Sequence, residues 1–157
     1  MKYMRLTKEQ FESLHQEFVN FLATQSIDKN EWEEIKKNRL EIAEQELDVF
    51  SDLIWEGVLN QTNYLDHFSK NFIFLFSCKE NEMESIILKT TDTTVDFMTV
   101  EGLQWMTENL FSEQMEIHHG IKKYTDERNV TIFNIIREGA VLSDGNLFRQ
   151  FQNIINE

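Results

Sequence analysis

The apolar side chains of this chain change their spacing twice along its length, and this change limits the folds that are open to it. Up to about residue 60 they recur every three or four residues, which is the period of an amphipathic helix. From Phe72 to Met98 they form short, nearly continuous runs separated by polar turns, which are typical of β-strands. Helical spacing returns after Thr99. Helices on either side of one block of strands predict an α+β fold rather than a parallel α/β fold.

Three short strands are predicted in the central block, at residues 72–78, 83–90 and 95–98. The polar connections between them are only a few residues long, and such short connections join antiparallel neighbours. The sequence therefore predicts a three-stranded antiparallel β-meander, with N-terminal helices before it and C-terminal helices packed on the sheet. Residues 140–142 are a candidate for a short additional edge strand.

Two helices are expected to begin with the same capping pattern. Thr7 places a hydroxyl three residues before Gln10, and Asp28 places a carboxylate three residues before Glu31. Such side chains satisfy the free amides of a first helical turn. The first helix is expected to end near Thr24. The other predicted helices cover residues 29–60 with a break near Asn38, residues 99–117, residues 125–138 and the stretch that follows Asp144.

The length and composition of the chain describe one folded domain of ordinary size. The chain has 157 residues, of which 41% are apolar and thirteen are phenylalanine. A domain of this length buries roughly two-thirds of the surface that its unfolded chain exposes, so a core forms without a disulfide or a metal. We therefore expect a single domain over residues 1–157.

The net charge of −13 argues against several classes of partner. An acidic surface repels phosphate groups, which disfavours nucleic acid and anionic membrane surfaces. Cys78 is the only cysteine, so no intrachain disulfide forms, and this suits a reducing compartment. The longest apolar run, residues 72–76, is far too short to cross a membrane, and the first 25 residues lack the apolar centre of a secretory signal. The sequence predicts a cytoplasmic protein.

Four stretches of the chain are distinctive in their residue order. They are Met1-Lys2-Tyr3 followed by Arg5-Leu6-Thr7, residues 48–55 (DVFSDLIW), residues 95–105 (VDFMTVEGLQW) and residues 137–148 (REGAVLSDGNLF). In these stretches, which span nearly the whole chain, the sequence resembles an uncharacterised bacterial family of short acidic proteins with a domain of unknown function. The resemblance implies a compact single domain, and it implies no activity and no functional residue.

The strongest candidate for a binding surface is a row of acidic residues in the second helical region. Glu44, Asp48 and Asp52 are four residues apart and share one helix face. Trp55 is expected close to Asp48 and Asp52 on the same side. Like charges at this spacing destabilise an isolated helix by a few tenths of a kcal/mol, so basic residues elsewhere in the chain or in a partner should compensate them. The alternative interpretation is a solvated helix face whose tryptophan is covered by another element.

We therefore expect a non-enzymatic protein-interaction module that needs no cofactor and binds a protein partner with a basic surface. The carboxylates would steer the partner, and the tryptophan would supply an apolar anchor of the kind found at interface hot spots. A symmetric homodimer stays open as another use of the many aromatic side chains. The expected contact residues are Glu44, Asp48, Asp52 and Trp55.

The first alternative function is a metal-dependent or hydrolytic enzyme that uses histidine and glutamate side chains. Two Glu-x-x-His steps occur, Glu12 with His15 and Glu116 with His119, and in helical bundles such steps help to hold di-iron or di-manganese centres. His118, beside His119, is a further candidate ligand or general base. Against a metal centre, the predicted sheet interrupts the helices, and surface or helix-end histidines explain the same residues.

Two other sites are open on the sequence alone. Asp66 and His67 would act with Cys78 only if its thiol were reactive, and a cysteine at the end of an apolar strand is usually an inert small hydrophobe. A small-molecule pocket lined by phenylalanine could lie between the sheet and a helical layer. The sequence does not distinguish such a pocket from an ordinary core.

Overall fold

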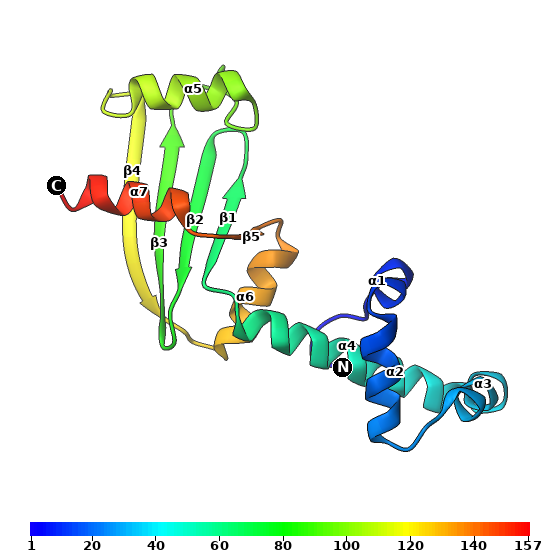
Figure 1. The fold of residues 1–157 in the computed structure, drawn as a ribbon. Helices are drawn as coiled ribbons and strands as arrows, with labels where there is room; N and C mark the ends of the chain where they lie inside the picture. Colours follow the sequence, from blue (N-terminus) through cyan, green and yellow to red (C-terminus); the bar gives the residue numbers. More distant parts are fainter. The chain divides into compact units, whose positions relative to one another are not determined.

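The structure is a computed structural model that describes all residues from 1 to 157, and they form two compact units. Unit 1 comprises residues 1–60, and unit 2 comprises residues 61–157 (Figure 1). The expectation of one domain over the whole chain stays a prediction. No helix of either unit is both long and apolar enough to span a membrane.

Unit 1 consists of helices, and both predicted capping patterns are confirmed. The Thr7 hydroxyl accepts a hydrogen bond from the Gln10 amide, and the Asp28 carboxylate accepts one from the Glu31 amide at 2.8 Å. The predicted break near Asn38 is confirmed as well, because only Arg39 separates the last two helices. The four helices are α1 (Lys8–Ser13), α2 (His15–Thr24), α3 (Lys29–Asn38) and α4 (Leu40–Asn60).

Aromatic side chains make up about half of the core cluster of unit 1. The ring of Phe50 on α4 packs edge-on against Phe18 of α2, with centroids 5.0 Å apart, and Trp32 of α3 meets the same Phe18 ring at 5.3 Å. Leu6 and Leu22 are buried in this cluster. Aromatic pairs in such geometries contribute about 0.5–1.5 kcal/mol beyond the area that they bury. Many of the phenylalanines are thus core residues that join α4 to the helices before it.

Unit 2 is built on a five-stranded antiparallel sheet, so the predicted meander of three strands was too small. The strand order is β4-β3-β2-β1-β5, and every neighbouring pair is antiparallel. The predicted strands at residues 72–78 and 83–90 are confirmed, as is the short edge strand near residue 141. The strands are β1 (Tyr64–Phe68), β2 (Phe72–Cys78), β3 (Glu82–Thr90), β4 (Met115–Lys123) and β5 (Val141–Ser143).

The strand predicted at residues 95–98 is wrong. This stretch is a turn in which the Val95 amide bonds to the Asp92 carbonyl and the Phe97 amide bonds to the Lys70 carbonyl. The side chains of Val95 and Phe97 are both buried. A loop that packs every second residue into the core therefore shows the same alternation of apolar and polar residues as a strand. The helix predicted for residues 99–117 is also too long, because α5 (Val100–Asn109) ends early and β4 begins at residue 115.

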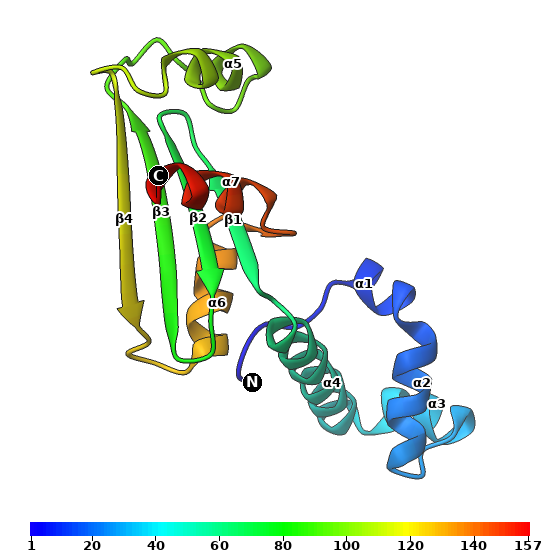
Figure 2. The same ribbon diagram turned by 60° about the vertical axis from the view of Figure 1, so that its left-hand side comes forward.

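The two faces of the sheet differ in how they are covered. On one face, the helix-covered face, Ile73, Leu75, Ile86 and Leu88 are buried, and they share a cluster with phenylalanines of α7 (Asn146–Ile155). Figure 2 shows α7 lying across this face and α5 at the end of the strands. The opposite, outer face carries the alternate residues of β2, whose rings are only half-buried. The last helix, α6 (Arg128–Arg137), meets one end of this outer face.

Gly102 gives a test of the packing in unit 2. A Cβ atom at this position would lie 1.7 Å from the Asp96 carbonyl oxygen, and the neighbouring Phe97 is fully buried. We expect Gly102→Ala to lower the free energy of unfolding by about 3 kcal/mol, because the loop backbone must move against a packed core. Urea unfolding followed by far-ultraviolet circular dichroism measures this change.

Gly57 is the matched control, since a Cβ atom there meets nothing within 4 Å in α4. Gly57→Ala should raise the free energy of unfolding by about 1 kcal/mol through helix propensity alone. Equal behaviour of the two variants would contradict the close approach of residues 96 and 102.

Candidate functional site

The predicted acidic row lies on one side of α4, and an extended segment of the same chain runs along it. This segment, residues 2–6, is called the leading segment below. It donates hydrogen bonds to Asp48, Asp52 and Glu56 and forms an ion pair with Glu44. The compensation of like charges that the sequence requires therefore comes from within the chain.

Arg5 bridges two carboxylates one helical turn apart. Its Nη1 lies 2.6 Å from the Glu44 carboxylate, and its Nε lies 2.7 Å from the Asp48 carboxylate. The hydrogen bonds that the Arg5 guanidinium donates to Asp48 and, with a smaller effect, to Glu44 raise its pKa. Charge-assisted bonds of this kind are among the stronger polar contacts in proteins. Both carboxylates remain partly exposed, with 47% of the Glu44 side chain and 33% of the Asp48 side chain accessible.

Asp52 and Glu56 bind the start of the segment. Backbone amides of Lys2 and Tyr3 donate to the two oxygens of the Asp52 carboxylate at 2.7 and 2.9 Å. The Tyr3 hydroxyl donates to Glu56 at 2.5 Å, and burial, followed by this contact, raises the pKa of Tyr3 to about 12. An acidic helix face thus binds an extended segment through both its main chain and its basic and aromatic side chains.

One side of α4 packs into the aromatic core and a second side carries the acidic row. A third side, next to the acidic row, is apolar and exposed. Ile42, Val49 and Leu53 are seven and four residues apart and therefore share a helix face. Val49 is 56% exposed and Leu53 is 58% exposed. We call these three residues the apolar stripe. The apolar stripe was not predicted from the sequence, although its spacing is as regular as that of the buried residues on the same helix.

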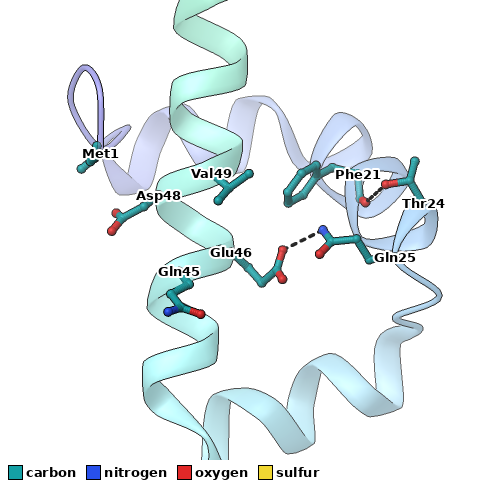
Figure 3. Close-up of a pocket in the computed structure, with 8 residues that line it drawn as sticks. All are labelled: Met1, Phe21, Thr24, Gln25, Gln45, Glu46, Asp48 and Val49. Carbon is teal, nitrogen blue, oxygen red and sulfur yellow. Dashed lines mark hydrogen bonds between the residues drawn. The ribbon is translucent and has the colours of Figure 1, made fainter.

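A hollow of about 490 Å³ borders the apolar stripe at Val49. Figure 3 shows Val49 of α4 and Phe21 of α2 turned toward each other, and Met1 also belongs to the lining. Gln25 donates a hydrogen bond of 2.7 Å to Glu46 and ties the two helices together beside the hollow. Asp48 is also part of the lining, so the hollow joins an acidic edge to apolar side chains.

Trp55, the predicted apolar anchor, is a partly buried residue of α4. Its side chain is partly buried and packs against the core cluster of unit 1, together with Ile54 and Leu47. Its predicted part in a contact surface stays a prediction. Val49 and Leu53 are exposed to a larger fraction on the same helix.

The structure does not bring the four predicted metal ligands together as two helical pairs. Glu12 lies near the end of α1, and His15 is the first residue of α2. The two residues therefore do not lie on one continuous helix. Glu116 and His119 lie on β4, where residues three apart point to opposite faces. No group of three or more histidine, cysteine, aspartate or glutamate side chains has the geometry of a metal site.

Cys78, Asp66 and His67 do not form a catalytic arrangement. Asp66 and His67 are neighbours on β1, and their side chains therefore point to opposite faces. Cys78 is buried, and this burial raises the pKa of its thiol to about 11. A thiol with such a pKa is almost entirely protonated at neutral pH and is a poor nucleophile.

One buried carboxylate, that of Glu84 on β3, was missed by the sequence analysis. Only 6% of its side chain is exposed, and His119 Nε2 lies 2.8 Å from it while Lys79 Nζ lies at 3.3 Å. Burial raises the pKa of this carboxyl, but hydrogen bonds from His119 and Lys79 outweigh the burial, so the pKa lies below its ordinary value. Its position two residues before Ile86 was the available signal, because alternate residues of a strand share a face.

Comparison with known proteins identifies a family but no activity. A family model described as a family of unknown function, DUF6495, matches residues 1–156 of the chain. No curated protein and no solved structure matches the chain.

Replacing Arg5 tests whether it holds the leading segment on α4. Arg5→Ala should lower the free energy of unfolding by about 1 kcal/mol, because two carboxylates lose their shared cation in a partly exposed position. The loss should shrink as salt is added. Arg39→Ala, which removes a single exposed ion pair to Glu34, is the control and should have a smaller effect. Equal effects would contradict the bridging role of Arg5.

Replacing Glu84 tests the buried carboxylate through its pH dependence. A carboxyl whose pKa is lowered by folding stabilises the protein above its unfolded pKa of about 4.3, and this contribution is lost as the pH falls through the folded pKa. Glu84→Gln should therefore be less stable than the wild type at pH 7, with the difference disappearing in acid. Urea unfolding at several pH values measures it, and the exposed Glu80→Gln is the control. A difference that is independent of pH would refute the argument.

Proposed function

We propose that this chain, which belongs to a family of unknown function (DUF6495), is a protein-interaction module that binds a basic protein partner through α4. The observation that carries the proposal is the apolar stripe, which lies exposed beside a row of partly exposed carboxylates. Interfaces commonly combine an apolar anchor with charges at its rim.

The charge of unit 1 supports a basic partner. Residues 1–60 contain thirteen acidic and seven basic side chains. Glu44 and Asp48 keep accessible surface although Arg5 contacts both of them. A partner that carries lysine or arginine therefore gains favourable electrostatic contacts along α4, and such complementarity raises association rates and favours the correct partner.

The contacts of the leading segment indicate which chemical groups bind to the acidic side of α4. Residues 2–6 place a lysine, a tyrosine and an arginine along the acidic side of α4, and the main-chain amides of Lys2 and Tyr3 donate to Asp52. A partner with arginine or lysine beside an apolar side chain would use the outer surface of the same carboxylates. Its apolar side chain would enter the hollow beside Val49.

The first experiment is a capture of partners from a lysate of the source organism, followed by binding measurements with the purified partner. The test variant is Val49→Ser with Leu53→Ser. It should bind at least tenfold more weakly than the wild type, because truncation of hot-spot residues costs about 2 kcal/mol or more. Wild-type binding should also weaken as salt is raised.

The matched control replaces two exposed apolar residues of unit 2, Met98→Ser with Val100→Ser. This variant should bind as the wild type does. Equal loss in both double variants would mean that the apolar stripe is not the contact surface. Failure of the wild type to capture any protein across a range of salt concentrations would remove the basis of the proposal.

A further inference from the structure

A second hollow, of about 260 Å³, lies in unit 2 between the outer face of the sheet and α6. Its position matches the small-molecule pocket that the sequence left open. The sheet contributes an apolar floor with one hydroxyl, and α6 contributes a wall. The lining comprises Phe76, Met83, Ser85, residues 122–125, Thr131 and Ile135.

The charge of this hollow is opposite to that of the chain. The chain has 28 acidic residues against 15 basic ones, but two lysines, Lys122 and Lys123, line the hollow together with no acidic residue. Glu82 and Glu84 lie beside the lining residues of β3 but do not line the hollow, and Glu82 is paired with Lys123 across β3 and β4. A local excess of positive charge in an acidic protein favours an anionic ligand.

Tyr124 and Thr131 fix the polar wall of the hollow. The Tyr124 hydroxyl donates to the Lys79 carbonyl at 2.9 Å, and the Thr131 hydroxyl donates to the Glu127 carbonyl at 3.1 Å. Burial raises the pKa of Tyr124 to about 12, so its ring stays neutral beside the lysines. The wall therefore adds no negative charge that would oppose an anion.

The floor of the hollow continues into an exposed aromatic surface. Phe72, Phe74 and Phe76 stand in a row along β2, with successive ring centroids 5.6 and 6.4 Å apart and the rings nearly parallel. All three are only half-buried, whereas the alternating Ile73 and Leu75 are fully buried. The Lys89 ammonium lies over Phe72 and ends the row on that side. Apolar surface thus extends from the hollow over Phe76 and Phe74.

We propose that this surface is a binding site for an organic anion with an apolar tail, of which a medium-chain carboxylate is the simplest example. The carboxylate binds at Lys122, whose side chain shares the outer face with Phe76, and the tail lies over Phe76 and Phe74. Binding pockets for drug-sized ligands have volumes of roughly 300–1,000 Å³, so a hollow of about 260 Å³ holds the head and the first part of the tail. The aromatic row covers the remainder.

The test uses the full chain labelled with nitrogen-15, titrated with dodecanoate below its critical micelle concentration and followed by NMR. Dodecanoate should give saturable shifts at the amides that line the hollow, notably Ser85, Lys122 and Ile135. Acetate, which lacks the tail, and dodecyltrimethylammonium, which carries the opposite charge, should bind at least tenfold more weakly.

Two variants assign the binding to this surface. Lys122→Glu with Lys123→Glu should weaken dodecanoate binding at least tenfold, whereas Lys29→Glu with Lys70→Glu, which makes the same change of charge elsewhere, should leave it within twofold. Gly120 faces Ser85, and a Cβ atom there would meet only the Ser85 Oγ at 3.9 Å. Gly120→Leu should therefore fold, place a side chain beside the hollow and weaken binding as well.

Three results would overturn the proposal. They are the absence of saturable shifts with dodecanoate, equal binding of dodecyltrimethylammonium, and shifts that lie away from the hollow and persist in the Lys122→Glu, Lys123→Glu variant. The last two would show that the aromatic row is a nonspecific apolar surface or that the anion binds elsewhere.

Discussion

Repulsion among the carboxylates of α4 is the constraint around which unit 1 is arranged. Acidic side chains on successive turns oppose helix formation, and the leading segment relieves this through Arg5 and the amides that bind Asp52. Because that segment occupies one side of the helix and the aromatic core occupies another, the third side stays open. The exposed apolar stripe follows from this division of one helix into three surfaces, and the proposed interaction follows from the stripe.

Local patterns in the sequence predicted local structure well. The predictions failed where contacts with residues distant in the sequence determine the structure. The caps at Thr7 and Asp28 and the break near Asn38 depend on neighbours and were correct. The acidic row was found, but the bridge from Arg5 spans more than forty residues and no spacing rule reports it. The strand predicted at residues 95–98 failed because core packing in a loop imitates alternation, and β4 was missed because Gly120 and its charged neighbours weaken the apolar signal.

The alternation of side chains between the two faces of β2 and β3 explains both the aromatic row on the outer face and the buried carboxylate of Glu84. The same rule that sends Ile73 and Leu75 to the helix-covered face sends the phenylalanines to the outer face, which α6 meets only at one end. It also carries Glu84 into the buried side, where His119 and Lys79 must accompany it. A buried carboxylate with these partners and an aromatic row near lysines are two outcomes of one backbone geometry.

The ends of the sheet bear on how the protein behaves when it is concentrated. An edge strand exposes main-chain groups that can pair with another molecule and start aggregation. Here β5 contributes only three residues at one edge. At the other edge, β4 is long but carries Gly120, two histidines and two lysines in place of a continuous apolar surface. Short length at one edge and charge at the other discourage edge-to-edge pairing with a second sheet, so this aromatic-rich chain can leave apolar side chains exposed with less risk of aggregation.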